Sequence, residues 1–149
     1  MFFKNKNSDE IAFFGGTPDQ NIWELSDDQD TAKISMQFSN EKNKKFSDIY
    51  NARIIAQYSN IIFEDITYAA TERAVNNLFQ AVFLLDNDSL KWLDISGNEI
   101  ILSLDKARQL LQLMRIQQDD CYVREANLKK QVNDCCDITS LETININFN

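Results

Sequence analysis

The clearest pattern in the sequence is a series of apolar positions spaced three and four residues apart between Leu104 and about Asp134. They are Leu104, Ala107, Leu111, Met114, Cys121, Leu128, Val132 and Cys135. No glycine or proline interrupts the series, and its polar gaps lie at Gln118 and Glu125. This spacing predicts one helix of about 45 Å, longer than a small domain is wide. Part of it must therefore pack on earlier helices or on another chain.

Apolar positions at helical spacing also occur earlier in the chain. Residues 46–57 and 69–85 each place them on one helical face. The first face carries Phe46, Ile49, Tyr50 and Ile54 together with the polar Arg53 and Gln57, and the second carries Ala74, Val75, Leu78, Phe79, Val82 and Leu85. Ser26-Asp27-Asp28 is typical of the cap and first turn of a short helix ending near Phe38. The polar segment from Ser39 to Lys45 then predicts a connection.

Short β-branched or aromatic runs indicate strands between these helices. Ile61-Ile62-Phe63 predicts a strand ending near Asp65. The segment from Leu90 to Leu102 has Ser96-Gly97-Asn98 at its centre, which predicts a tight β-hairpin. Ser103 can then cap the long helix, and a short segment at 140–144 follows it.

At the N-terminus, the apolar runs Phe2-Phe3 and Ile11 to Phe14 flank a polar loop and predict a second hairpin, which Gly15, Gly16 and Pro18 end. We therefore expect a mostly α, α+β fold. It combines a small N-terminal hairpin and linker module, residues 1–40, with a helical domain, residues 46–145.

The charge of the chain argues against two classes of partner. Lys and Arg number 15 against 23 Asp and Glu, a formal net charge of −8 that repels phosphate backbones, so we expect no nucleic-acid partner. Apolar runs fall far short of the ~20 residues that cross a bilayer, so we expect no membrane role. The opening MFFKNKNSDE lacks the apolar stretch of a signal peptide, and Cys121, Cys135 and Cys136 form no disulfide framework. These features favour the cytoplasm.

The reactive groups of the chain offer no catalytic, cofactor-binding or metal-binding candidate. The chain has no histidine, three glycines and no phosphate-loop or nucleophile-elbow motif. The three cysteines lack a fourth ligand, and the acids at Asp86 and Asp88 lack the spacing of a calcium loop. We expect a protein-binding function and no enzyme. Candidate contact residues are Trp23, Gln118 and Glu125, whereas Trp92 is expected to cover the core.

Residues 46–145 also contain a set of residues whose types and order resemble those of a known domain family. They are Arg53, Phe63, Trp92, Gly97, Ile100, Leu102, Leu128, Lys129, Val132 and Leu141. In this order the chain resembles a domain family of unknown function found in tailed-bacteriophage and prophage proteins encoded near tail-fibre genes. The N-terminal segment is similar to the opening modules of phage tail-fibre assembly proteins.

The resemblance implies a phage tail accessory protein in the cytoplasm of the bacterial host, with a tail-fibre subunit as partner. The exposed face of the long helix and the acidic N-terminal module are the expected contacts. One alternative is a structural tail or fibre component, virion-associated and homo-oligomeric through the long helix. Another is a small acidic inhibitor of a host enzyme, with negative charge that mimics nucleic acid.

Overall fold

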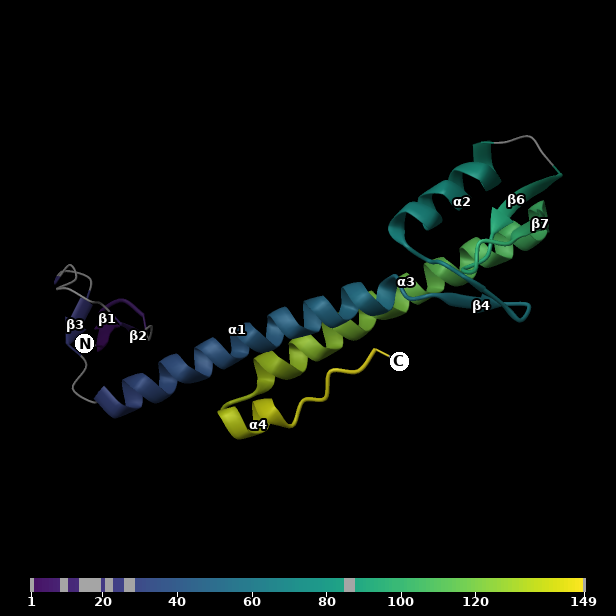
Figure 1. The fold of residues 1–149 in the computed structure, drawn as a ribbon. Helices are drawn as coiled ribbons and strands as arrows, with labels where there is room; N and C mark the ends of the chain where they lie inside the picture. The colour runs from purple at the N-terminus through teal and green to yellow at the C-terminus, as the bar shows by residue number, and fades with distance from the viewer. Residues whose placement is uncertain are drawn as a thin grey trace. The chain divides into compact units, whose positions relative to one another are not determined.

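The computed structural model describes residues 2–8, 11–13, 20, 23–25, 29–84 and 88–148 (Figure 1). Most of the chain is helical, and its strands form small antiparallel sheets, which confirms the mostly α, α+β fold class. The elements within these ranges are β1 (Phe2–Asn5), β2 (Ile11–Phe13), β3 (Trp23–Leu25), α1 (Gln29–Gln57), β4 (Ile61–Phe63), β5 (Ile66–Tyr68), α2 (Glu72–Leu84), β6 (Ser89–Leu93), β7 (Glu99–Ser103), α3 (Leu104–Asp134) and α4 (Ile138–Glu142).

The chain divides into two compact units, and α1 and α3 contribute residues to both. The first unit consists of Met1–Asp48 and Lys130–Asn145, and the second of Ile49–Lys129 and Ile146–Asn149. Each unit has buried apolar residues of its own.

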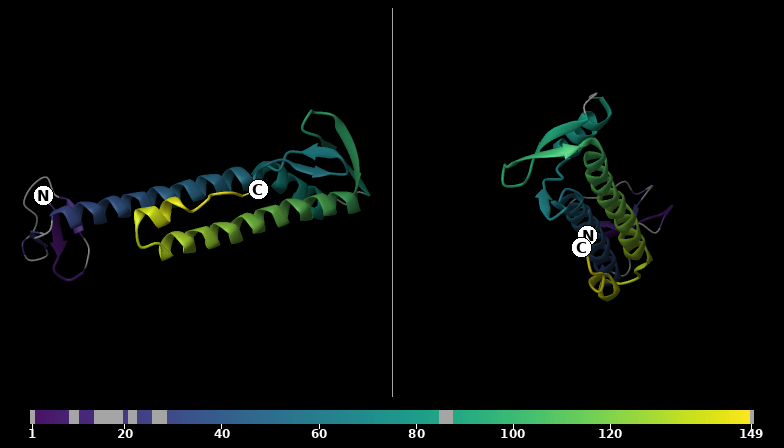
Figure 2. Two further views of the ribbon diagram at one scale, coloured as in Figure 1. Left: turned by 90° about the horizontal axis from the view of Figure 1, so that it is seen from below. Right: turned by 90° about the vertical axis from the view of Figure 1, so that its right-hand side faces the viewer.

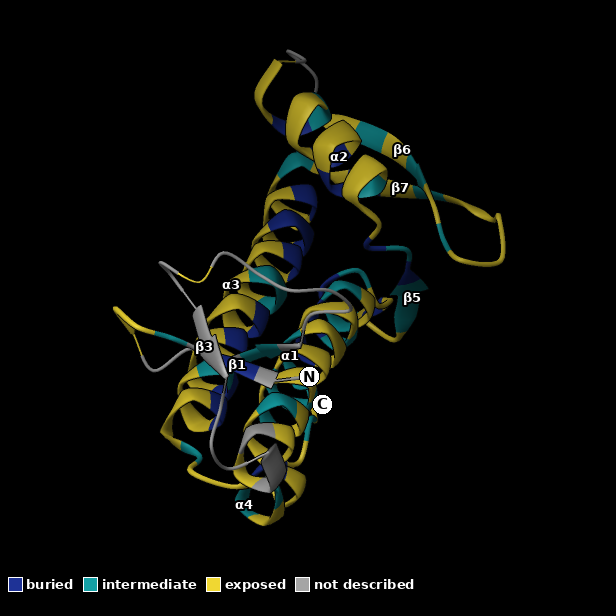
Figure 3. Cartoon of the chain, turned by 90° about the vertical axis from the view of Figure 1, so that its left-hand side faces the viewer, coloured by how far each residue is buried: buried dark blue, intermediate teal, exposed yellow. Residues whose placement is uncertain are grey.

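The core of the second unit forms where α2 and two β-hairpins pack on the first half of α3. Figure 1 shows these elements gathered around that part of the helix. Its most deeply buried side chains include Tyr68, Leu78, Leu110 and Met114. Figure 3 shows buried positions recurring along α3, as the spacing in the sequence predicts.

Alternation along the β6–β7 hairpin explains how it covers this core. Leu90 pairs with Leu102 and Trp92 pairs with Ile100; Leu102 belongs to the buried cluster, and the other three side chains pack against it. Intervening positions are exposed, as expected for a sheet with one solvated face. The structure therefore confirms the predicted hairpin and the core-covering position of Trp92.

Two tight turns close the hairpins of the second unit in different ways. At the β6–β7 turn, Gly97 has φ +85°, and the Asp94 carboxylate accepts hydrogen bonds from Ser96 N and Asn98 N, each at 2.8 Å. A hydrogen bond from the Asn98 side chain, together with these backbone bonds, lowers the pKa of Asp94. At the β4–β5 turn, Glu64 and Asp65 have φ of 51° and 62°. Because Glu seldom adopts this conformation, the sequence carried no turn signal there and β5 was not predicted.

The first unit contains α4 and the segments of α1 and α3 beside it. Asp137 caps α4, since its carboxylate accepts a hydrogen bond of 2.7 Å from Ser140 N and the Ser140 hydroxyl receives one from Asp137 N. This hydrogen bonding lowers the pKa of Asp137. Val132, Leu141 and Ile144 are buried, because the chain folds back after α3 (Figure 1).

The N-terminal strands, also part of the first unit, form a sheet in the order β2-β1-β3. Phe2 pairs with Phe13 in the predicted hairpin. The third strand, β3, was not predicted; it pairs Trp23 with Asn5. The residues of the Gly15, Gly16 and Pro18 signal lie outside the described part of the chain.

The prediction of a connection from Ser39 to Lys45 is wrong, because α1 is continuous through this segment. The segment is polar but has no glycine or proline, so a solvated helix can form. Lys42 Nζ lies 4.8 Å from the centre of the Phe38 ring and donates a hydrogen bond of 3.2 Å to Asn133 O. The boundary predicted between residues 40 and 46 therefore falls inside α1, and the predicted cap at 26–28 lies outside the described residues.

The long helix α3 is confirmed from Leu104 to Asp134. Ser103 acts as its cap, since the hydroxyl accepts a hydrogen bond of 3.4 Å from Lys106 N. Local signals were sufficient here because both the cap and the apolar spacing are encoded within neighbouring turns.

We expect Trp92→Ala to lower the free energy of unfolding by about 2 to 3 kcal/mol, less than for a fully buried Trp because this ring is half-buried. Urea denaturation followed by circular dichroism measures the change. Leu93→Ala, on the exposed side of the same strand, is the control and should cost about 0.5 kcal/mol or less. A Trp92→Ala variant as stable as the wild type contradicts the core assignment.

Candidate protein-binding groove

A buried ion pair joins α1 to α3 in the second unit. Arg53 Nε lies 2.7 Å from Glu125 Oε2, and the two residues are only 6% and 7% exposed. The other carboxylate oxygen of Glu125 lies 2.7 Å from Lys129 Nζ. Among the described residues, Arg53 Nε has no aligned hydrogen-bond acceptor, so its contact with Glu125 is an ion pair and not a hydrogen bond.

Neighbouring side chains complete the surroundings of Arg53. A terminal nitrogen of the guanidinium donates a hydrogen bond to Gln57 Oε1. The guanidinium carbon lies 5.0 Å from the ring centre of Tyr50 and 4.7 Å from that of Tyr122, within cation–π range. In place of water, the buried guanidinium of Arg53 therefore contacts a carboxylate, an amide oxygen and the faces of two aromatic rings.

The side chain of Gln117 holds the C-terminal end of α1. Its Nε2 donates to Ala56 O at 3.1 Å and to Ser59 O at 3.0 Å, and lies 3.3 Å from Gln57 O. The last carbonyls of a helix lack partners within the helix, and this amide adds a donor to Ala56 O, which also accepts from Ser59 N and Ser59 Oγ. Both views of Figure 2 show the last turns of α1 beside the middle of α3.

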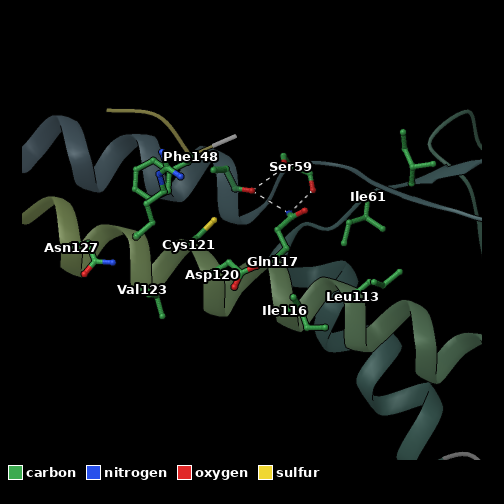
Figure 4. Close-up of a pocket in the computed structure, with 13 residues that line it drawn as sticks. Ser59, Ile61, Leu113, Ile116, Gln117, Asp120, Cys121, Val123, Asn127 and Phe148 are labelled. Atoms are coloured by element: carbon green, nitrogen blue, oxygen red, sulfur yellow. Dashed lines mark hydrogen bonds between the residues drawn. The ribbon is translucent and has the colours of Figure 1, made fainter. Parts of the chain in front are cut away.

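Next to this junction lies a groove of about 730 Å³, which we call the α3 groove (Figure 4). It is bordered by the end of α1, the start of β4, the middle of α3 and the C-terminal segment. The lining residues are Ala56, Ser59, Ile61, Ile62, Leu113, Ile116, Gln117, Asp120, Cys121, Val123, Arg124, Asn127 and Phe148.

Several apolar side chains of the α3 groove are open to solvent. Ile62 on β4 is 72% exposed, and on α3 Ile116 is 45% and Val123 62% exposed. Asp120 lies between these two α3 residues in the sequence, and Arg124 follows one turn later. Within the described residues, neither of these charged side chains takes part in an ion pair, because each ion pair found there joins other residues.

The candidate contact residues predicted from the sequence differ in their surroundings. Glu125 is buried in the ion pair with Arg53, Gln118 is half-buried on α3, and Trp23 lies on β3, where nothing is described of its side chain. The α3 groove is not predicted by the sequence pattern. A signal was present, since Leu113, Ile116 and Val123 are apolar yet fall outside the main helical stripe.

The cysteines occupy different environments. Cys121 is buried, Cys135 is half-buried and Cys136 is exposed. Burial raises the pKa of the Cys121 thiol, the nearby Asp120 raises it further, and Arg53 opposes this. Within the described residues, no three His, Cys, Asp or Glu side chains are grouped to hold a metal ion. In the same part of the chain, no helix is both long and apolar enough to cross a membrane.

We expect Glu125→Ala to lower the free energy of unfolding by about 3 to 5 kcal/mol, because it leaves the buried Arg53 charge without its carboxylate. The double variant Arg53→Met with Glu125→Leu should recover most of this loss. Urea denaturation measures both. Glu99→Ala, which breaks the exposed pair with Lys91, is the control and should cost about 1 kcal/mol or less. Equal losses for Glu125→Ala and Glu99→Ala contradict the prediction.

Alkylation by iodoacetamide should follow the order Cys136, then Cys135, then Cys121, because reaction needs an accessible thiolate. The raised pKa of Cys121 keeps its thiol protonated to a higher pH than a free cysteine. Peptide mass spectrometry over time gives the three rates, with the unfolded chain as control. Modification of native Cys121 as fast as Cys136 would show that its described burial does not hold in solution.

Comparison with known proteins places the chain in no group. No protein-family model matches the sequence, and no curated protein or solved structure is significantly similar to it.

Proposed function

We propose that the chain is a protein-binding accessory protein of a tailed-bacteriophage or prophage tail-fibre apparatus, a chaperone or assembly factor that acts in the cytoplasm of the bacterial host. The observation that carries the binding function is the α3 groove, which leaves Ile62, Ile116 and Val123 in solvent. Exposed apolar groups beside polar ones are typical of surfaces that bind other proteins.

The connection with tail fibres is supported by the positions of the residues that carry the sequence resemblance. Arg53 and Lys129 are both ion-paired to Glu125, and Gly97 has the positive φ of its turn. Five others are buried or packed against buried clusters: Phe63, Trp92, Ile100, Leu102 and Leu128. Val132 and Leu141 are buried as well. A shared fold would require these residue types at such positions.

The test is co-expression of the tagged chain with the tail-fibre genes encoded beside it, followed by affinity purification and mass determination. We expect a fibre subunit to co-elute, and the chain to be absent from purified phage particles. An unrelated acidic protein of similar size and charge, carrying the same tag, is the control for capture by charge alone.

Other results would replace the proposal. Retention of the chain in purified particles as a stable oligomer would make it a structural tail component. Co-elution of a host enzyme in place of a fibre subunit would favour the acidic inhibitor. Elution of the chain alone would remove the support for a tail-fibre partner.

A further inference from the structure

Helix α3 has a second apolar stripe besides the one that packs on α1. Leu113, Ile116, Asp120, Val123 and Asn127 follow steps of three and four residues and all line the α3 groove. Side chains at this spacing lie along one face of a helix. This second face is rotated away from the buried series of Met114, Cys121 and Leu128, so burial of the first face leaves the second available.

The C-terminal segment of the chain indicates what kind of ligand enters the α3 groove. From Ile144 to Phe148 the backbone adopts neither helix nor strand. Ile144 is buried, Ile146 and Phe148 are half-buried, and Asn145 and Asn147 are exposed. Apolar side chains at alternate positions thus face the protein, and Phe148 lies at the α3 groove (Figure 4). The groove thus accepts an aromatic side chain from a segment without helix or strand, and part of the groove beside this side chain stays unfilled.

Charge restricts the ligand further. Asp120 belongs to the apolar stripe, and covering an unpaired carboxylate is unfavourable unless the ligand supplies a cation or hydrogen-bond donors. The net charge of −8 adds a long-range preference for a basic ligand. A purely apolar segment is therefore a poor match.

The same charge argues against a second copy of the chain as occupant. In an antiparallel pair of α3 helices about a two-fold axis, matching Ile116 with Val123 of the second copy brings Asp119 and Asp120 of both copies to the axis. Matching Asp120 with Arg124 of the second copy instead sets Ile116 against position 128, where the side chain is buried within its own chain. A parallel two-fold pair places Asp120 against its own counterpart. In each arrangement, either the exposed apolar side chains lack an apolar partner or the carboxylates of the two copies face each other.

We propose that the α3 groove binds an extended segment of another protein, with apolar side chains at alternate positions and a Lys or Arg that pairs with Asp120, and that this segment displaces Phe148. This inference rests on the proposed function only in taking the occupant to be a protein. It assigns the binding surface and the chemistry of the ligand.

The probe is a fluorescein-labelled peptide of residues 144–148 carrying Asn145→Lys and Asn147→Lys, compared with the same peptide carrying Glu at both positions. Fluorescence anisotropy with the full chain measures binding. We expect the lysine peptide to bind about tenfold more tightly than the glutamate peptide, and Asp120→Lys to reverse this preference. The full-length Phe148→Ala variant should bind the lysine peptide about tenfold more tightly than the wild type, because the competing side chain is removed.

A matched pair of variants locates the binding site. Ile116→Ser with Val123→Ser should abolish binding of the lysine peptide. Leu93→Ser with Ile101→Ser, which changes two similarly exposed apolar residues on the β6–β7 hairpin, should leave it unchanged. Circular dichroism checks that each variant is folded.

Three results would overturn the proposal: equal binding of both peptides whatever residue stands at position 120, peptide binding that survives Ile116→Ser with Val123→Ser, or a dimer of the wild type that this double variant dissociates. The last would make a second copy the occupant. The proposed function can fail while this inference holds. If the peptide binds with the expected dependence on charge and on positions 116, 120, 123 and 148, but no fibre subunit is recovered in the co-expression experiment, the α3 groove remains a peptide-binding site. If the Ile116→Ser, Val123→Ser variant still captures a fibre subunit, the proposed function is kept and the assignment of the α3 groove as its binding site is contradicted.

Discussion

The junction between α1 and α3 in the second unit depends on the buried pair of Arg53 and Glu125. A guanidinium is costly to bury alone, so a shift of one helix along the other by a single turn would leave Arg53 without its carboxylate and Glu125 with Lys129 alone. The pair therefore selects one register for the helices. Apolar side chains alone tolerate such shifts more easily, because their contacts are not directional.

The same register brings Gln117 to the end of α1, two helical turns before Glu125 on α3. Its amide reaches the carbonyls of Ala56 and Ser59, where α1 stops and the chain turns toward β4. This turn forms one border of the α3 groove, and α3 forms another. The ion pair thus fixes the geometry of a surface that contains neither of its own residues.

Helix α3 therefore carries two stripes of side chains, one that packs in the protein and one that lies in solvent. One stripe packs on α1 and on the core of the second unit, with Glu125 as its charged member, while the stripe through Ile116 and Val123 stays in solvent. Asp120 limits how that second stripe can be covered, since it favours a basic ligand over an identical helix. A segment with an aromatic side chain that enters the groove as Phe148 does, and with cations added, suits both the apolar and the charged features of the groove.

The sequence by itself determined the elements whose signals are local. The bounds of α3, its Ser103 cap and the turn at Gly97 all follow from residues a few positions apart. Tertiary structure decided the rest. The continuity of α1 through its lysine-rich segment, the pairing of β5 across a Glu64-Asp65 turn and the burial of Glu125 have no comparable local signal. The α3 groove brings together segments some sixty residues apart, such as Ser59 and Gln117, and only the pairing of α1 with α3 places them side by side.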